Sequence, residues 1–68
     1  METMRHFYFT EEETGEEFIV GAHTLPEAKE IAEDVGIAIG KNYGVHYYIE
    51  YQYEMTEEEA EESGLDEY

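Results

Sequence analysis

The stretch Thr24–Gly40, TLPEAKEIAEDVGIAIG, decides the fold because it carries the clearest helical signature in the chain. Thr24 and Glu27 have the spacing of a capping box, and Pro26 falls in the first turn, where its missing N–H costs nothing. The apolar residues recur at three and four positions: Ala28, Ile31, Ala32, Val35 and Ile39. This period predicts an amphipathic helix that begins after Thr24.

Two glycines are candidates for the end of this helix. Gly40 is the expected stop, and Gly36 would end the helix one turn earlier. In either case Lys41–Gly44 is predicted to form a turn.

Two strands joined by a hairpin are predicted before the helix. Met4–Thr10 and Glu17–Ala22 are rich in aromatic and β-branched residues, with large apolar side chains two positions apart. Between them, Glu11–Glu16 contains Gly15, which can take the positive φ that hairpin loops often require.

A third strand is predicted over Val45–Met55, where apolar and polar residues alternate. The alternation assigns one set to the face that packs on the helix: Val45, Tyr47, Ile49, Tyr51, Tyr53 and Met55. Tyr47, Tyr51 and Tyr53 are then expected to form the core and its rim, with their hydroxyls reaching water.

A short acidic helix is predicted at the end of the chain. Thr56–Glu59 is a second capping box, Met55 and Ala60 have the spacing of a hydrophobic staple, and Gly64 is placed to end the helix. Such a helix is too short to be stable alone. It must therefore dock through Met55, Ala60 and Leu65 or fray.

These elements predict one α+β domain over residues 1–68. A right-handed crossover through the long helix gives a three-stranded antiparallel sheet in the order second, first, third. The long helix covers one face, and the other is expected to be open to water or a partner. The open face would carry some of the following: His6, Tyr8, His46, Tyr48, Glu50 and Gln52.

The charge of the chain is its dominant property, with 19 acids against three Lys and Arg residues and a formal net charge of −16. Because 41% of the residues are apolar and 15% are aromatic, a folded body with an acidic coat is expected rather than disorder. The chain has no cysteine and no apolar run long enough to span a membrane. A soluble protein in an intracellular, reducing setting is expected.

Neither an enzyme nor a metal or cofactor site is expected. Ser63 is the only serine and lies in an acidic segment, and no glycine-rich phosphate loop follows a strand. His6, His23 and His46 are spread over the chain without the short spacing of a histidine metal site.

The charge itself implies a basic partner. About −5 to −8 is enough to keep a small domain soluble, and self-repulsion at −16 destabilises the compact state. Direct binding of nucleic acid is excluded because phosphates would be repelled. A sphere of this chain length is about 28 Å across, and the same length of duplex DNA carries roughly 16 charges.

Two acidic runs on a small, cysteine-free frame, Glu11–Glu17 and Glu57–Glu62, carry a resemblance to known proteins. The chain resembles the small acidic DNA mimics of phages and mobile elements, which include anti-CRISPR proteins, restriction blockers and uracil-DNA glycosylase inhibitors. The resemblance is one of class and transfers no individual residue. It implies an inhibitor in the host bacterial cytoplasm that occupies the nucleic-acid-binding surface of a basic DNA-binding protein, with a CRISPR effector subunit as the leading target.

The residues expected to contact this partner are acids on three elements and two exposed tyrosines. They are Glu11, Glu12, Glu13, Glu16, Glu17, Glu30, Glu33, Asp34, Glu57, Glu58, Glu61, Glu62, Tyr8 and Tyr48. No membrane partner is expected, and the chain does not indicate whether the protein is a monomer or a dimer.

Two other functions stay open. One is a halophilic or merely solubilised α+β module, whose stability would require molar salt. The other is an adaptor that binds a protein through the exposed Tyr and His side chains of the sheet, with charge only steering the encounter.

Overall fold

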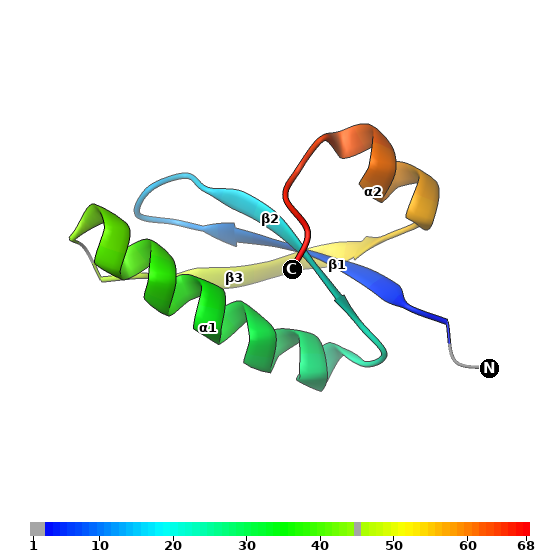
Figure 1. Ribbon diagram of the computed structural model, residues 1–68, viewed down its shortest axis with the longest axis horizontal. Coiled ribbons are helices and arrows are strands. Elements are labelled where there is room, and N and C mark those ends of the chain that lie inside the picture. Colours follow the sequence, from blue (N-terminus) through cyan, green and yellow to red (C-terminus); the bar gives the residue numbers. More distant parts are fainter. Residues whose placement is uncertain (1–2, 45) are drawn as a thin grey trace.

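The computed structural model describes residues 3–44 and 46–68, and its elements follow the predicted order (Figure 1). They are β1 (Arg5–Glu11), β2 (Glu17–Ala22), α1 (Leu25–Tyr43), β3 (Ile49–Met55) and α2 (Glu57–Ser63). The strands form one antiparallel sheet in the order β2-β1-β3. The predicted α+β fold is confirmed, with α1 on one face of the sheet and α2 on the other.

The hairpin of β1 and β2 supplies most of the core under α1. Phe7 pairs with Val20 and Phe9 pairs with Phe18, and all four are buried against α1. Because side chains alternate along a strand, the intervening positions of β1 point to the opposite face. Gly15 has a φ of 77°, the positive value expected for the hairpin loop.

α1 begins where the sequence predicts. The Thr24 hydroxyl accepts a hydrogen bond from the Glu27 amide at 3.3 Å, and Pro26 lies in the first turn. This contact satisfies one of the amides that a helix leaves unpaired at its N-terminus.

The end of α1 differs from the prediction. The helix runs through both candidate glycines and is capped by Gly44, which has a φ of 66° and donates its N–H to the Gly40 carbonyl. The prediction of a stop at Gly36 or Gly40 was wrong, and the predicted turn that follows is the last turn of the helix. Gly36 has a packing role instead, because a Cβ there would lie 2.6 Å from the Tyr47 ring and 2.7 Å from Ile49.

β3 is shorter than the predicted strand. It begins at Ile49, and His46–Tyr48 precede it without regular strand pairing. Val45, the predicted first residue, lies outside the described residues.

β3 also contains a bulge. Tyr8 of β1 faces Tyr53, but the next residue, Phe9, faces Tyr51, so Gln52 is an extra residue in the pairing. A slip of one residue turns every following side chain to the other face. The single alternation predicted for this strand was therefore wrong: Tyr51 packs toward α1, whereas Tyr53 and Met55 turn away from it.

α2 docks on the second face rather than fraying. Met55 and Ala60 are buried there with Ile19, and Tyr8 and Leu65 pack against them. The predicted capping box at the start of α2 is present in both directions.

The last residues form an unpredicted contact with the outer edge of β2. The Ile19 amide donates to the Asp66 carbonyl at 2.9 Å, and the Gly21 amide donates to the Tyr68 carbonyl at 2.8 Å. The Tyr68 amide donates back to Ile19 at 2.8 Å, in a parallel arrangement. One edge of the sheet is therefore covered by the chain itself.

Candidate acidic interaction surface

All three Lys and Arg residues lie on the α1 side of the sheet. Lys29 and Lys41 belong to α1. Arg5 lies 4.9 Å above the Phe7 ring and donates to both carboxylate oxygens of Glu54, at 3.1 and 2.7 Å. Within the described residues, the side of the sheet that faces away from α1 has no Lys or Arg.

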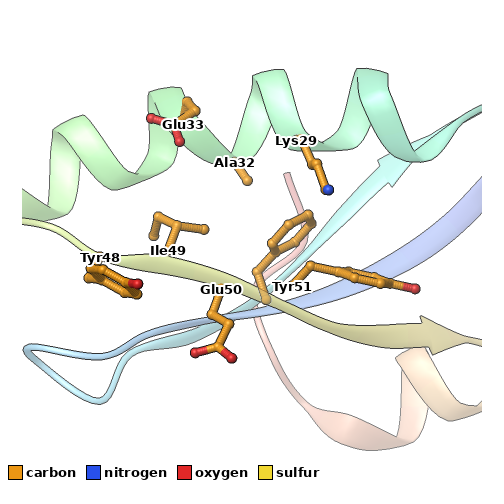
Figure 2. A pocket seen from close by; sticks show the side chains of 8 residues that line it. Lys29, Ala32, Glu33, Tyr48, Ile49, Glu50 and Tyr51 are labelled. Atoms are coloured by element: carbon orange, nitrogen blue, oxygen red, sulfur yellow. The ribbon is translucent and has the colours of Figure 1, made fainter.

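That opposite side gathers exposed carboxylates from the hairpin, β3 and α2, and we call it the acidic side. Figure 1 shows α2 over part of this side, and Figure 2 shows Glu50 and Tyr48 on the side of β3 away from α1. The exposed carboxylates that we assign to it are Glu12, Glu17, Glu50, Glu57, Glu58, Glu61 and Glu62. Glu59, which closes the α2 capping box, and Glu67, which pairs with His6, lie on the same side.

Tyrosines lie among these acids. The Tyr8 and Tyr53 rings are 5.1 Å apart, and the Tyr8 hydroxyl donates a hydrogen bond to Glu17. This hydrogen bond, together with burial, raises the pKa of Tyr8 to about 12. Tyr48 and Tyr53 are exposed. The acidic side therefore combines negative charge with the aromatic hydroxyls that are common at protein interfaces.

Two of these acids are close enough to repel each other. A side-chain hydrogen bond to Glu50, followed by the charge of Glu50, raises the pKa of Glu12.

Other predicted contact residues lie elsewhere. Tyr43 donates to Glu16 at 2.7 Å and Tyr47 donates to Glu33 at 2.9 Å, which raises the pKa of both tyrosines and fixes both carboxylates. The predicted contact acids that lie in the loop or on the α1 side are Glu13, Glu16, Glu30, Glu33 and Asp34. Because α1 and α2 lie on opposite faces, no flat partner surface contacts all the predicted acids (Figure 1).

Glu11 was wrongly predicted to contact a partner, because it is 1% exposed. Its carboxylate accepts hydrogen bonds from the amides of Tyr48 at 2.5 Å, Thr14 at 2.8 Å and Glu13 at 3.1 Å, and from the Thr14 hydroxyl. Burial raises the pKa of Glu11, but these hydrogen bonds lower it by more, so the net pKa lies below the usual value. Glu11 orders the hairpin loop.

The acidic side includes residues that the sequence analysis did not assign to a contact. Glu50 was placed on the open face but not among the contacts, and Tyr53 was placed in the core. The bulge at Gln52 explains why Tyr53 lies on the acidic side and not in the core. His6 accounts for a further difference, because it pairs with Glu67 at 2.8 Å and part of the predicted Tyr and His face is thereby covered.

A groove of about 450 Å³ lies between α1 and β3 (Figure 2). It is lined by Phe9, Lys29, Ala32, Glu33, Tyr48, Ile49, Glu50 and Tyr51. Among residues 3–44 and 46–68, no three His, Asp or Glu side chains are grouped to hold a metal ion. No helix in the same ranges has the length and apolar composition of a membrane span.

A scan against protein-family models and searches of curated proteins and of solved structures each returned no match. The function is therefore inferred from the charge and geometry of this chain.

Proposed function

We propose that this protein is a non-enzymatic inhibitor that occupies the nucleic-acid-binding surface of a basic bacterial protein. Its carboxylates would take the places of DNA phosphates. The observation that carries the proposal is the placement of the cations, with every Lys and Arg on the α1 side and none on the acidic side. A basic groove would therefore meet the protein in one orientation.

Fixed carboxylates support the same function. Glu17 is held by the Tyr8 hydroxyl, and α2 carries its acids on a docked helix rather than on a frayed tail. Charges held in place before binding lose less conformational entropy when the partner arrives. Residues four apart on a helix, such as Glu58 and Glu62, are about 6 Å apart.

The shape changes the comparison with DNA. The protein is elongated, with axes of 40, 23 and 16 Å. A duplex 40 Å long carries about 24 charges at one per ~1.7 Å, so the net charge of −16 is about two thirds of that of DNA. The sequence analysis predicted a closer match in charge because it treated the protein as a sphere.

The first experiment identifies the partner. The protein, immobilised through α1, captures basic proteins from a bacterial lysate at low salt, and duplex DNA is then used for elution. A CRISPR effector subunit is the target class to test first. We expect the captured protein to bind DNA when free and to be released by DNA and by increasing salt.

The second experiment compares two matched charge reversals. Glu58→Lys with Glu62→Lys changes the acidic side, and Glu30→Lys with Asp34→Lys makes the same change four residues apart on α1. We expect the first pair to weaken capture by about tenfold or more, since it places like charges against the basic partner, and the second pair to have little effect. Equal losses for both pairs would indicate a nonspecific acidic coat.

A second candidate function is an adaptor, and the exposed Tyr48 and Tyr53 on the acidic side favour it. In that case Tyr48→Ala would abolish capture, while the acid reversals would change mainly the association rate. A DNA duplex would then leave the captured complex intact.

A further inference from the structure

The two edges of the sheet differ in their backbone pairing. The outer edge of β2 is paired with Asp66–Tyr68. β3 forms the other edge, and in the described part of the chain it pairs only with β1. An open edge presents unpaired N–H and C=O groups to which another strand can be added.

The direction of the β3 backbone identifies the groups that are available. The Glu12 amide donates to the Tyr48 carbonyl at 2.9 Å, so the backbone of Tyr48 points toward β1. Because the direction alternates along an antiparallel strand, the backbone groups of Ile49 and Tyr51 point outward. The bulge at Gln52 ends this regular stretch.

The groove between α1 and β3 lies directly beside this edge (Figure 2). Phe9 and Ala32 are buried and give it an apolar floor, and Tyr51 packs on the same cluster. Gly36 lets Tyr47 and Ile49 approach α1 closely near the start of β3. The groove therefore has the parts of a strand-binding site: an open backbone edge and an adjacent apolar surface.

We propose that this groove binds an extended segment of a protein partner in which basic and apolar residues alternate. Added to the β3 edge, such a strand would turn one set of side chains into the apolar groove and the other toward the acidic side near Glu50. The first set is then apolar and the second is Lys or Arg. The regular edge over residues 48–51 accepts about four residues, or roughly 13 Å of strand.

Charge decides between this occupant and a second copy of the chain. Pairing two β3 edges would bring two bodies of net charge −16 together. A basic segment instead gains from the field of the whole protein. This inference does not depend on the proposed inhibition of a DNA-binding protein, since it rests on the backbone edge of β3 and the apolar groove beside it. The two proposals share only Tyr48 and Glu50, which line the groove and also belong to the acidic side.

The direct test uses two synthetic peptides of the same composition. One is acetyl-Lys-Val-Lys-Val-Lys-Val-amide, and the other contains three Lys followed by three Val. Binding is followed by NMR of the ¹⁵N-labelled protein at low salt. We expect the alternating peptide to bind at least about tenfold more tightly, to shift the Ile49 and Tyr51 amides and to slow their hydrogen exchange.

Equal affinity for the two peptides, or shifts spread over α2 instead of β3, would overturn the proposal. A matched pair of variants separates local contact from general charge. Glu50→Lys should weaken the alternating peptide about tenfold, whereas Glu58→Lys, the same charge change on α2, should leave its affinity within about twofold. Equal losses would contradict binding at the β3 edge.

The unmodified protein offers an independent check by sedimentation. A dimer that forms without peptide and protects the Ile49 and Tyr51 amides would assign the edge to a second copy and refute the proposal. This test uses no DNA-binding partner, so its failure would leave the competition with DNA unaffected.

Discussion

The hairpin loop and α2 are both runs of glutamate, yet the fold uses them in opposite ways. At the start of the loop, Glu11, the last residue of β1, is buried and accepts hydrogen bonds from the backbone around it. In α2, Glu59 accepts from the Thr56 amide at 3.0 Å to close the capping box. The remaining α2 carboxylates have no hydrogen-bond or ion-pair partner among the described residues: Glu57, Glu58, Glu61 and Glu62.

This difference separates charge that stabilises the fold from charge that is available to a partner. Neighbouring acids in one run can belong to different classes, because burial and the direction of the side chain decide, not composition. Removing an acid should therefore change stability with opposite sign in the two regions.

The largest expected effect is that of Glu11→Ala. Removing the Glu11 carboxylate leaves buried N–H and O–H donors without an acceptor, which costs about 3 kcal/mol. A domain of this size has only a few kcal/mol of stability. We expect a largely unfolded protein, measured by urea denaturation with circular dichroism. Glu13→Ala removes an exposed acid from the same loop and should change the unfolding free energy by less than about 0.5 kcal/mol. Similar effects for both would refute the assigned role of Glu11.

The docking of α2 gives the next largest effect. Met55 is buried under α2, and Met55→Ala should cost about 2 kcal/mol through the lost apolar contact and the cavity. Hydrogen exchange in α2 should also accelerate, because the helix is too short to persist alone. Met4→Ala truncates a methionine that is 50% exposed and should leave both measurements unchanged. An unchanged α2 in Met55→Ala would show that the helix is not held by this cluster.

A smaller effect is expected in the pH dependence of stability. The folded pKa of Glu11 is lowered, so its contribution is present above the unfolded pKa of about 4.3 and is lost as pH falls through the folded value. The folded pKa of Glu12 is raised by Glu50, so the protein gains stability as pH falls through that value. Stability should therefore first rise and then fall on acidification.

Glu11→Gln separates the rise in stability from the fall, because it keeps one acceptor oxygen and removes the charge of Glu11. Its unfolding free energy, measured by urea titration at a series of pH values, should keep the rise and show a smaller fall at low pH. The remaining fall comes from Glu54, because the hydrogen bond from Arg5 lowers its pKa as well. An unaltered fall would assign acid unfolding to other carboxylates.

The smallest effect distinguishes the two regions by sign. Glu61→Gln relieves the repulsion with Glu57 one turn away and should raise the unfolding free energy by a few tenths of a kcal/mol. Glu17→Gln weakens the acceptor of the Tyr8 hydroxyl and should lower it slightly. Precise urea midpoints, measured side by side, test both, and the same sign for the two would contradict the comparison.

The sequence predicts the parts of the fold that depend on local signals. Thr24 and Thr56 mark both helix starts, because capping requires a hydroxyl at a fixed spacing. The sheet order follows from the handedness of the crossover. Gly64 ends α2 as predicted. The end of α1 was less predictable, since Gly36 is required for close packing with Tyr47 and not for a cap.

Long-range contacts account for most of the remaining differences. The period-two pattern of β3 continues across Gln52, so nothing local marks the bulge that turns Tyr53 away from α1. Asp66–Tyr68 pair through backbone groups, which leave no trace in the side-chain pattern. For Glu11 a signal was present, because the alternation of Phe7 and Phe9 continues to Glu11 and places it on the buried face.

The sequence predicted the residue types of the candidate site, but not how these residues are arranged in space. Composition predicted acids and tyrosines as the contact groups, but the proposed acidic side depends on which face each residue occupies. That assignment needs the positions of α2, of Glu50 and of the three cations in space.

The most direct test of the central claim is a titration of the captured complex with duplex DNA at constant salt. The labelled protein, its partner and DNA are followed together by fluorescence anisotropy and sedimentation. If the acidic side occupies the DNA site, DNA will displace the protein completely, and the midpoint will rise in proportion to the protein concentration. A stable ternary complex, in which the partner holds protein and duplex at once, would contradict the account.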